Sequence, residues 1–186
     1  MDEVDPDQAE VMARIEPFLS RLYPILPAAL DRYLSETTPL ARAEHTDLAA
    51  AASVWSHAWA GLQMEFGVEP GFHFLEMRGL HVMNMRDELV IRLKKVDANG
   101  RHRNADTLQQ RQFDRQMSLP GLPPAAARLV LGYQPDAGFS TVERVTLRRP
   151  RGAWVTQIVE VEEQVTWVDI TPASLFSGVE RRRAAG

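Results

Sequence analysis

The spacing of hydrophobic residues changes once along this chain, near Gly71, and this change is what most limits the folds it can adopt. Before Gly71, apolar residues such as Val11, Ile15 and Leu19 recur every three or four positions, which is the stripe of an amphipathic helix. After Gly71, apolar and polar residues alternate, as in a half-buried strand. The sequence therefore predicts an α+β fold, with N-terminal helices packed on an antiparallel sheet of about six strands.

Local signals divide the helical part. The first stripe, over residues 8–34, contains Pro17, Pro24 and Pro27, and proline removes a backbone donor and clashes with the preceding turn. Two or three short helices are therefore predicted there. A longer helix is predicted over residues 46–66, with Thr46 as its N-cap and Gly67 as its end.

The second part of the chain reads as strands joined by turns. Strands are predicted at residues 72–78, 80–85, 88–95, 127–134, 141–149 and 153–161, with a further candidate at 164–170. Between the third and fourth strands, residues 101–124 predict a short helix near 107–115 and then an irregular loop. The predicted organisation is an acidic helical segment (1–70), an antiparallel β-rich segment of the same domain (71–177) and a flexible tail (178–186).

Composition removes several classes of function. The 186 residues include no cysteine, which excludes disulfides, thiolate zinc sites, iron–sulfur clusters and cysteine nucleophiles. The first residues are acidic and no apolar run reaches the roughly 20 residues of a membrane span, so a cytoplasmic protein without membrane association is expected. No glycine-rich phosphate loop and no histidine pair with metal-ligand spacing occurs, so neither a cofactor nor a metal is expected.

Charge is segregated along the chain. Residues 1–70 carry a net charge of −8, whereas the remaining residues carry +4. If the edges of the predicted sheet meet, the basic residues of its strands, turns and loop would form one surface. The candidate members of this basic surface are Arg92, Lys94, Lys95, Arg101, Arg103, Arg111, Arg115, Arg148, Arg149 and Arg151.

Three interpretations of this surface remain open: it binds nucleic acid, it docks an acidic protein segment, or it is only solvated. Between Arg92 and Arg128 the only aromatic residue is Phe113, which argues against stacking on a single-stranded nucleic acid. The leading hypothesis is a small cytoplasmic regulatory or interaction protein, without catalysis. It would bind a partner protein, with nucleic acid as a second candidate, through the basic sheet face and the 101–124 loop.

A metal-dependent nuclease or other hydrolase is the competing hypothesis. Pro135-Asp136 followed by Glu143 opens a PD-(D/E)xK-like pattern, but Arg144 and Val145 follow where an acid-x-Lys element would be. Asp87, Glu88 and Lys94 form the other candidate set. Carboxylates more than about 8 Å apart could not share one ion, whose ligand oxygens lie at about 2 to 2.6 Å.

One short segment suggests a specific partner. The pentapeptide Gln116, Met117, Ser118, Leu119 and Pro120 resembles the Gln-Leu-Ser-Leu-(Phe/Pro) peptide by which many bacterial proteins bind the replicase sliding clamp. The resemblance implies an extended peptide whose glutamine and leucines enter pockets on the clamp. A structural turn is the alternative for these residues.

A longer pattern runs through residues 88–159. It comprises Lys94-Lys95, Asn104, Thr107-x-x-Gln110, Leu119-Pro120-Gly121-x-Pro123 and Leu131-Gly132-Tyr133-x-x-Asp136. This half of the chain resembles a group of uncharacterised bacterial proteins encoded beside helix-turn-helix or ImmA-type regulators, often in mobile elements. The resemblance implies a regulatory or toxin–antitoxin-like role through a partner, and it supplies no catalytic residues.

Overall fold

A computed structural model of the chain describes residues 6–77, 79–97, 112–115, 121–150 and 154–172. The helical part breaks near Pro17 and Pro24, as predicted, whereas Pro27 lies in the first turn of a helix and does not break it. Pro17 lies in the first turn of a 3₁₀ helix, and Pro24 directly precedes the third α-helix. The elements before Gly71 are α1 (Pro6–Ile15), η1 (Glu16–Phe18), α2 (Leu19–Leu22), α3 (Ile25–Glu36), α4 (Pro39–Glu44) and α5 (Asp47–Phe66).

Threonine side chains fix the starts of the last two helices. Thr38 Oγ1 accepts the N–H of Ala41 at the start of α4, and Thr46 Oγ1 accepts the N–H of Ala49 at the start of α5, each at 3.2 Å. Each bond satisfies one of the backbone donors that a helix leaves without an internal partner. The predicted cap at Thr46 and the predicted end at Phe66 are both confirmed. None of the described helices is both long and apolar enough to span a lipid bilayer.

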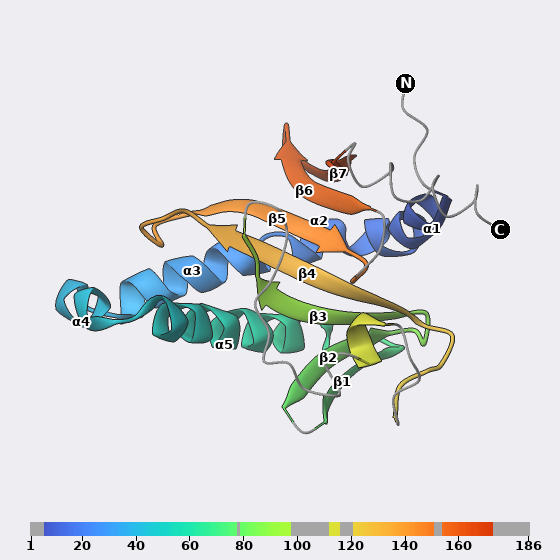
Figure 1. Cartoon of the computed structure of the whole chain (residues 1–186), viewed down its shortest axis with the longest axis horizontal. Helices are drawn as coiled ribbons and strands as arrows, with labels where there is room; N and C mark the ends of the chain where they lie inside the picture. The colour runs from blue at the N-terminus through green and yellow to red at the C-terminus, as the bar shows by residue number, and fades with distance from the viewer. Residues whose placement is uncertain (1–5, 78, 98–111, 116–120, 151–153, 173–186) are drawn as a thin grey trace, which may run out of the picture.

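After Gly71 the chain forms one sheet whose strands lie in sequence order (Figure 1). The α+β class and the packing of N-terminal helices on a sheet are confirmed, with seven strands rather than about six. The strands are β1 (Phe72–Met77), β2 (Leu80–Met85), β3 (Leu89–Lys95), β4 (Ala127–Pro135), β5 (Val142–Arg148), β6 (Val155–Val161) and β7 (Gln164–Asp169).

One pair of strands departs from the predicted antiparallel pattern. β3 and β4 run parallel, with Leu89 opposite Ala127 and Lys95 opposite Tyr133. Parallel neighbours need a connection of a dozen or more residues, and residues 96–126 are long enough to return the chain to the start of β3. The alternation of apolar residues indicates that both segments are strands, but it does not determine whether they pair in a parallel or an antiparallel direction.

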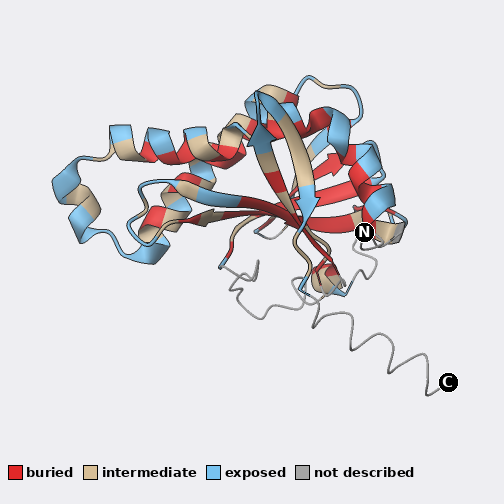
Figure 2. Ribbon diagram, turned by 90° about the horizontal axis from the view of Figure 1, so that it is seen from above, coloured by how far each residue is buried: buried red, intermediate tan, exposed pale blue. Residues whose placement is uncertain are grey.

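The helices cover one face of the sheet (Figure 2). On that face, strand residues pack with helix residues in one large core, whose members include Ile91 and Leu131 of the sheet and Leu26, Leu30 and Leu62 of the helices. On the opposite face, a smaller apolar group surrounds Phe113, and its members are Leu80, Val82, Val90, Phe113, Leu122, Ala126 and Val130. The sheet therefore has a helix-covered face and a second face, which carries a different set of side chains.

Polar contacts tie the helices to the sheet. Asp7 of α1 forms an ion pair with Arg149 and accepts the indole N–H of Trp154 at 2.8 Å. The indole of Trp55 on α5 donates to the carbonyl of Leu93 at 3.1 Å, and the hydroxyl of Tyr133 donates to a backbone carbonyl of α5 at 3.0 Å. The predicted flexible tail, residues 178–186, lies outside the described residues.

Candidate binding face

Four basic side chains gather on the face of the sheet opposite to the helix-covered one. They are Arg92 and Lys94 on β3, Arg128 on β4 and Arg148 on β5, and we call them the cationic face. The register explains why they meet. Arg92 pairs with Val130, which in turn pairs with Arg148, and Arg128 pairs with Val90, two residues before Arg92. Since neighbouring strands lie about 4.8 Å apart and each residue advances about 3.3 Å, all four Cα atoms fall within about 14 Å of one another.

Burial sets the electrostatics of this face. Arg92 is 7% exposed and Arg128 is 1% exposed, whereas Lys94 and Arg148 are half-buried. Removal from water lowers the pKa of Arg92 to about 10 and also lowers the pKa of Arg128. Burial, and then repulsion from Arg92, lowers the pKa of Lys94 to about 8. Burial thus disfavours the charged forms of Arg92, Lys94 and Arg128.

A short helical turn at residues 112–114 lies against this face. The guanidinium carbon of Arg92 is 5.2 Å from the centroid of the Phe113 ring, a cation–π distance. The charge of Asp114 raises the pKa of both Arg92 and Lys94, against the larger effect of burial. This turn therefore supplies an apolar cover and one carboxylate to the cationic face.

The structure divides the basic surface predicted from the sequence. Arg92, Lys94 and Arg148 share the cationic face, but Lys95 lies on the other side of β3, with its ammonium 4.2 Å from the centroid of the Phe139 ring. Arg149 is engaged with Asp7 of α1, on the helix side. Arg115 is exposed at the turn. The remaining predicted members, Arg101, Arg103, Arg111 and Arg151, lie outside the described residues.

Sequence reasoning missed Arg128 as a member of the cationic face. The alternation along β4 separates Arg128, Val130 and Gly132 from the core residues Leu129, Leu131 and Tyr133. That pattern could have placed Arg128 on a face away from the helices. Only the pairing of β4 with β3 shows that this face also carries Arg92.

The two candidate acid sets of the nuclease hypothesis do not combine into one site. Asp87 and Glu88 precede β3, whereas Asp136 follows β4, and these strands are parallel and in register over seven residues. At about 3.3 Å per residue, Asp87 and Asp136 lie about 20 Å or more apart, too far to share an ion. Glu143 accepts the side-chain amide of Gln134 at 2.7 Å. Within the described ranges, no three His, Asp or Glu side chains are grouped closely enough to hold a metal.

Asp136 instead organises the hairpin between β4 and β5. Its carboxylate accepts the N–H of Thr141 at 2.9 Å, the hydroxyl and N–H of Ser140 at 2.8 and 2.5 Å, and the N–H of Gly138 at 3.3 Å. These donors, the N–H of Thr141 first, lower the pKa of Asp136 to about 2. Such a carboxylate is a permanent anion that shapes a loop.

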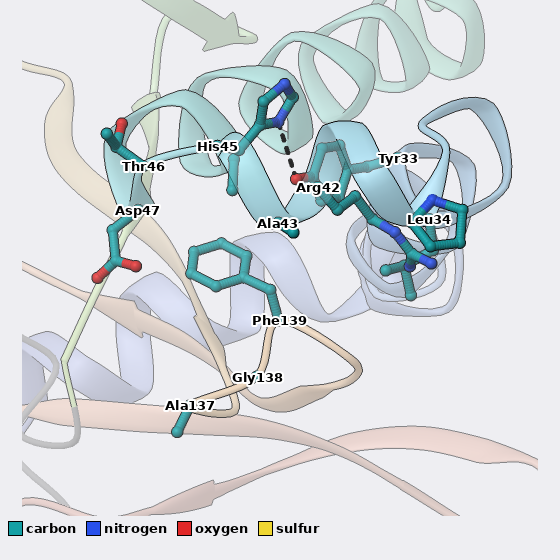
Figure 3. A pocket seen from close by; sticks show the side chains of 12 residues that line it. Tyr33, Leu34, Arg42, Ala43, His45, Thr46, Asp47, Ala137, Gly138 and Phe139 are labelled. Atoms are coloured by element: carbon teal, nitrogen blue, oxygen red, sulfur yellow. Dashed lines mark hydrogen bonds between the residues drawn. The ribbon is translucent and has the colours of Figure 1, made fainter.

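A cavity of about 380 Å³ lies next to this hairpin (Figure 3). The end of α3, the helix α4 and the start of α5 form one wall, and the hairpin supplies the other. The lining residues are Tyr33, Leu34, Pro39, Arg42, Ala43, His45, Thr46, Asp47, Ala50, Ala137, Gly138 and Phe139. No sequence pattern indicated this cavity, because its two walls come from segments far apart in the chain.

The peptide that resembles a sliding-clamp motif, Gln116–Pro120, lies outside the described residues. Comparison with known proteins gives no match to a family model, to a curated protein or to a solved structure. Functional inference for this chain therefore depends on its own side chains and their placement.

Proposed function

We propose that this protein is a small regulatory or interaction protein, without catalysis, that binds an acidic segment of a partner protein through the cationic face. The observation that supports the proposal is the placement of Arg92, Lys94, Arg128 and Arg148 together on the face of the sheet opposite to the helix-covered one. Burial, joined at Lys94 by repulsion from Arg92, lowers the pKa of three of the four groups. The positive charge of this face would attract an acidic segment, so binding would be favoured by charge complementarity.

A protein partner fits this face better than a nucleic acid. Arg92 and Arg128 are almost fully buried, which leaves Lys94 and Arg148 as the members able to contact a ligand directly. Two accessible cations would neutralise few phosphates, whereas nucleic-acid binding commonly uses several. The aromatic ring near the face, Phe113, is itself buried and offers no stacking surface. Nucleic-acid binding without chemistry remains the second candidate.

The proposal also includes the kind of cellular system in which the protein acts. The resemblance of residues 88–159 to proteins encoded beside helix-turn-helix or ImmA-type regulators supports a role of the toxin–antitoxin or mobile-element accessory kind, in the cytoplasm. A partner in such a system would be a regulator with an acidic surface. The sliding clamp is an alternative partner through Gln116–Pro120. The hydrolase alternative has less support, because its two acid sets lie at opposite ends of β3 and β4 and, among the described residues, no three His, Asp or Glu side chains group as metal ligands.

Affinity capture from an extract of the native cell tests the proposal. The wild type is compared with the double variant Lys94→Gln/Arg148→Gln and with a matched control, Arg14→Gln/Arg32→Gln, whose residues lie on the helices and pair with acids one turn away. Both double variants remove two positive charges. We expect the wild type and the control to retain the same acidic protein, and the Lys94→Gln/Arg148→Gln variant to lose it.

Two further measurements separate the alternatives. Reconstituted binding of the recovered protein should weaken with added salt, because exposed charges are screened over about 10 Å at 0.1 M. Binding of a labelled DNA duplex should be weak and should not distinguish the two double variants. If no protein is recovered, or if both double variants retain it equally, the cationic face is not the binding surface.

A further inference from the structure

The cavity beside the β4–β5 hairpin is separate from the cationic face, and its chemistry points to a ligand of its own. It opens among α3, α4 and α5 on the helix-covered side of the sheet. A volume of about 380 Å³ falls within the range of small-molecule sites, which is about 300 to 1,000 Å³. Its lining combines apolar side chains with a few charged and polar ones.

Arg42 supplies a cation to this cavity. Its side chain is half-buried, and among the described residues the structure gives it no ion pair or hydrogen bond. In Figure 3 the Arg42 side chain lies to one side of the Phe139 ring, and Asp47 lies to the other. Asp47 is exposed, so water screens its carboxylate more effectively than it screens the half-buried guanidinium. The cavity therefore attracts an anion at its Arg42 end.

Phe139 forms a preorganised apolar wall. Its backbone has φ of +51°, a left-handed conformation that is strained for a bulky residue, and the Asp136 carboxylate holds the surrounding loop in place. The Lys95 ammonium lies 4.2 Å from the ring centroid and contributes a cation–π contact. A rigid wall loses little conformational entropy when a ligand binds.

A hydrogen bond fixes the polar part of the helical wall. The hydroxyl of Tyr33, which is 2% exposed, lies 3.0 Å from Nδ1 of His45, and the two rings are stacked. This bond joins α3 to the segment between α4 and α5. The position of α4, and with it that of Arg42, is thereby set before any ligand arrives.

From these features we infer that the cavity binds a small carboxylic acid with an apolar body. The planar guanidinium of Arg42 offers parallel N–H donors that match the two oxygens of a carboxylate. The apolar body would lie against Phe139 and the small side chains Ala43 and Ala50. This inference concerns binding alone and does not depend on the cationic face.

Three probes of one shape test the inference: 3-phenylpropanoate, its neutral amide and 3-phenylpropylamine. Isothermal titration calorimetry with the full chain gives the affinities, and amide chemical shifts of Ala137 and Gly138 locate the ligand. We expect the acid to bind with a dissociation constant on the order of a millimolar, which is ordinary for so small a ligand. It should bind about ten times more tightly than the amide, because a bond between charged partners is the stronger one. The amine should bind most weakly.

Variants assign the roles of the two key residues. Arg42→Gln should remove the preference for the acid over the amide, and Arg42→Lys should restore part of it. Phe139→Leu should weaken the binding of the acid and of the amide to the same extent. The control is Arg32→Gln, which removes an equal charge from α3, where Arg32 pairs with Glu36.

The results that would overturn this inference differ from those that would overturn the proposed function. Absence of acid binding at millimolar concentration, equal affinity for acid and amide, or an unchanged preference in Arg42→Gln would each overturn the inference. So would binding that is lost in Lys94→Gln but kept in Arg42→Gln, because the acid would then occupy the cationic face. Retention of acid binding by a protein that captures no partner would leave the inference standing and remove the proposed function.

Discussion

Replacing Lys94 by methionine should stabilise the protein at neutral pH. Lys94 is half-buried beside Arg92, and its pKa is lowered from 10.5 to about 8. One pKa unit corresponds to about 1.4 kcal/mol, so keeping Lys94 charged in the folded state costs at most about 3.5 kcal/mol. Partial exposure reduces this figure, and we expect Lys94→Met to gain about 1 to 2 kcal/mol at pH 7. Methionine preserves most of the packing of the lysine stem.

The gain in stability from Lys94→Met should decrease as pH rises. Because folding lowers the pKa of Lys94, the cost is full below about pH 8 and declines as pH rises towards 10.5, where the unfolded lysine loses its proton. The advantage of Lys94→Met should therefore be smaller at pH 9.5 than at pH 7. Urea unfolding followed by tryptophan fluorescence at both pH values measures the difference.

A matched control isolates the cause. Lys95→Met removes the same charge from the next residue, whose ammonium contacts the Phe139 ring on the other side of the strand. This variant should show no gain, or a small loss. If Lys94→Met is no more stable than the wild type at pH 7, or if its gain is the same at both pH values, the electrostatic account of the cationic face is wrong.

Three further predictions concern the packing that supports the sites. Gly132→Ala would place a Cβ 2.6 Å from Thr146 Oγ1 and 2.7 Å from Val96 Cγ1, which should cost about 1 to 3 kcal/mol in urea unfolding, and adding Val96→Ala should recover part of it. Asp7→Ala leaves the N–H of Trp154 buried without its acceptor, and we expect a loss of about 1 to 3 kcal/mol with faster hydrogen exchange in α1. Tyr133→Phe should cost about 1 kcal/mol at pH 7. Because burial raises the pKa of Tyr133, the wild type should also lose stability as pH rises above 10, and this loss should be smaller in the variant, as thermal unfolding across that range would show.

Local sequence signals accounted for most of the elements. The prolines separated α1, α2 and α3, the Thr46 cap and the Gly67 stop bounded α5, and period-two alternation located every strand to within one or two residues. These signals succeed because helix caps, proline constraints and strand alternation depend on residues close together in the chain. These local signals could not predict the parallel pairing of β3 with β4, because the direction of pairing depends on the connection and on the partner strand rather than on the residues of one strand.

The candidate sites were predictable only in part. The basic residues of β3 and of the segment after β5 stood out by charge, but neighbours in sequence such as Lys94 and Lys95 point to opposite faces of the sheet. Arg128 joined the set only through its register with β3. The cavity had no sequence signal, since Arg42 and Phe139 are brought together by the packing of α4 against a distant hairpin.

The sequence by itself determined the class of this protein, the order of its helices and strands, and the absence of cysteine chemistry. These are consequences of residue identity and short-range spacing, which the folded chain cannot alter. The tertiary structure alone decided which charges share a face and where a cavity forms. Strand pairing and helix packing join residues far apart in the chain, and the free energy that selects one register comes from burying the apolar face of all strands together.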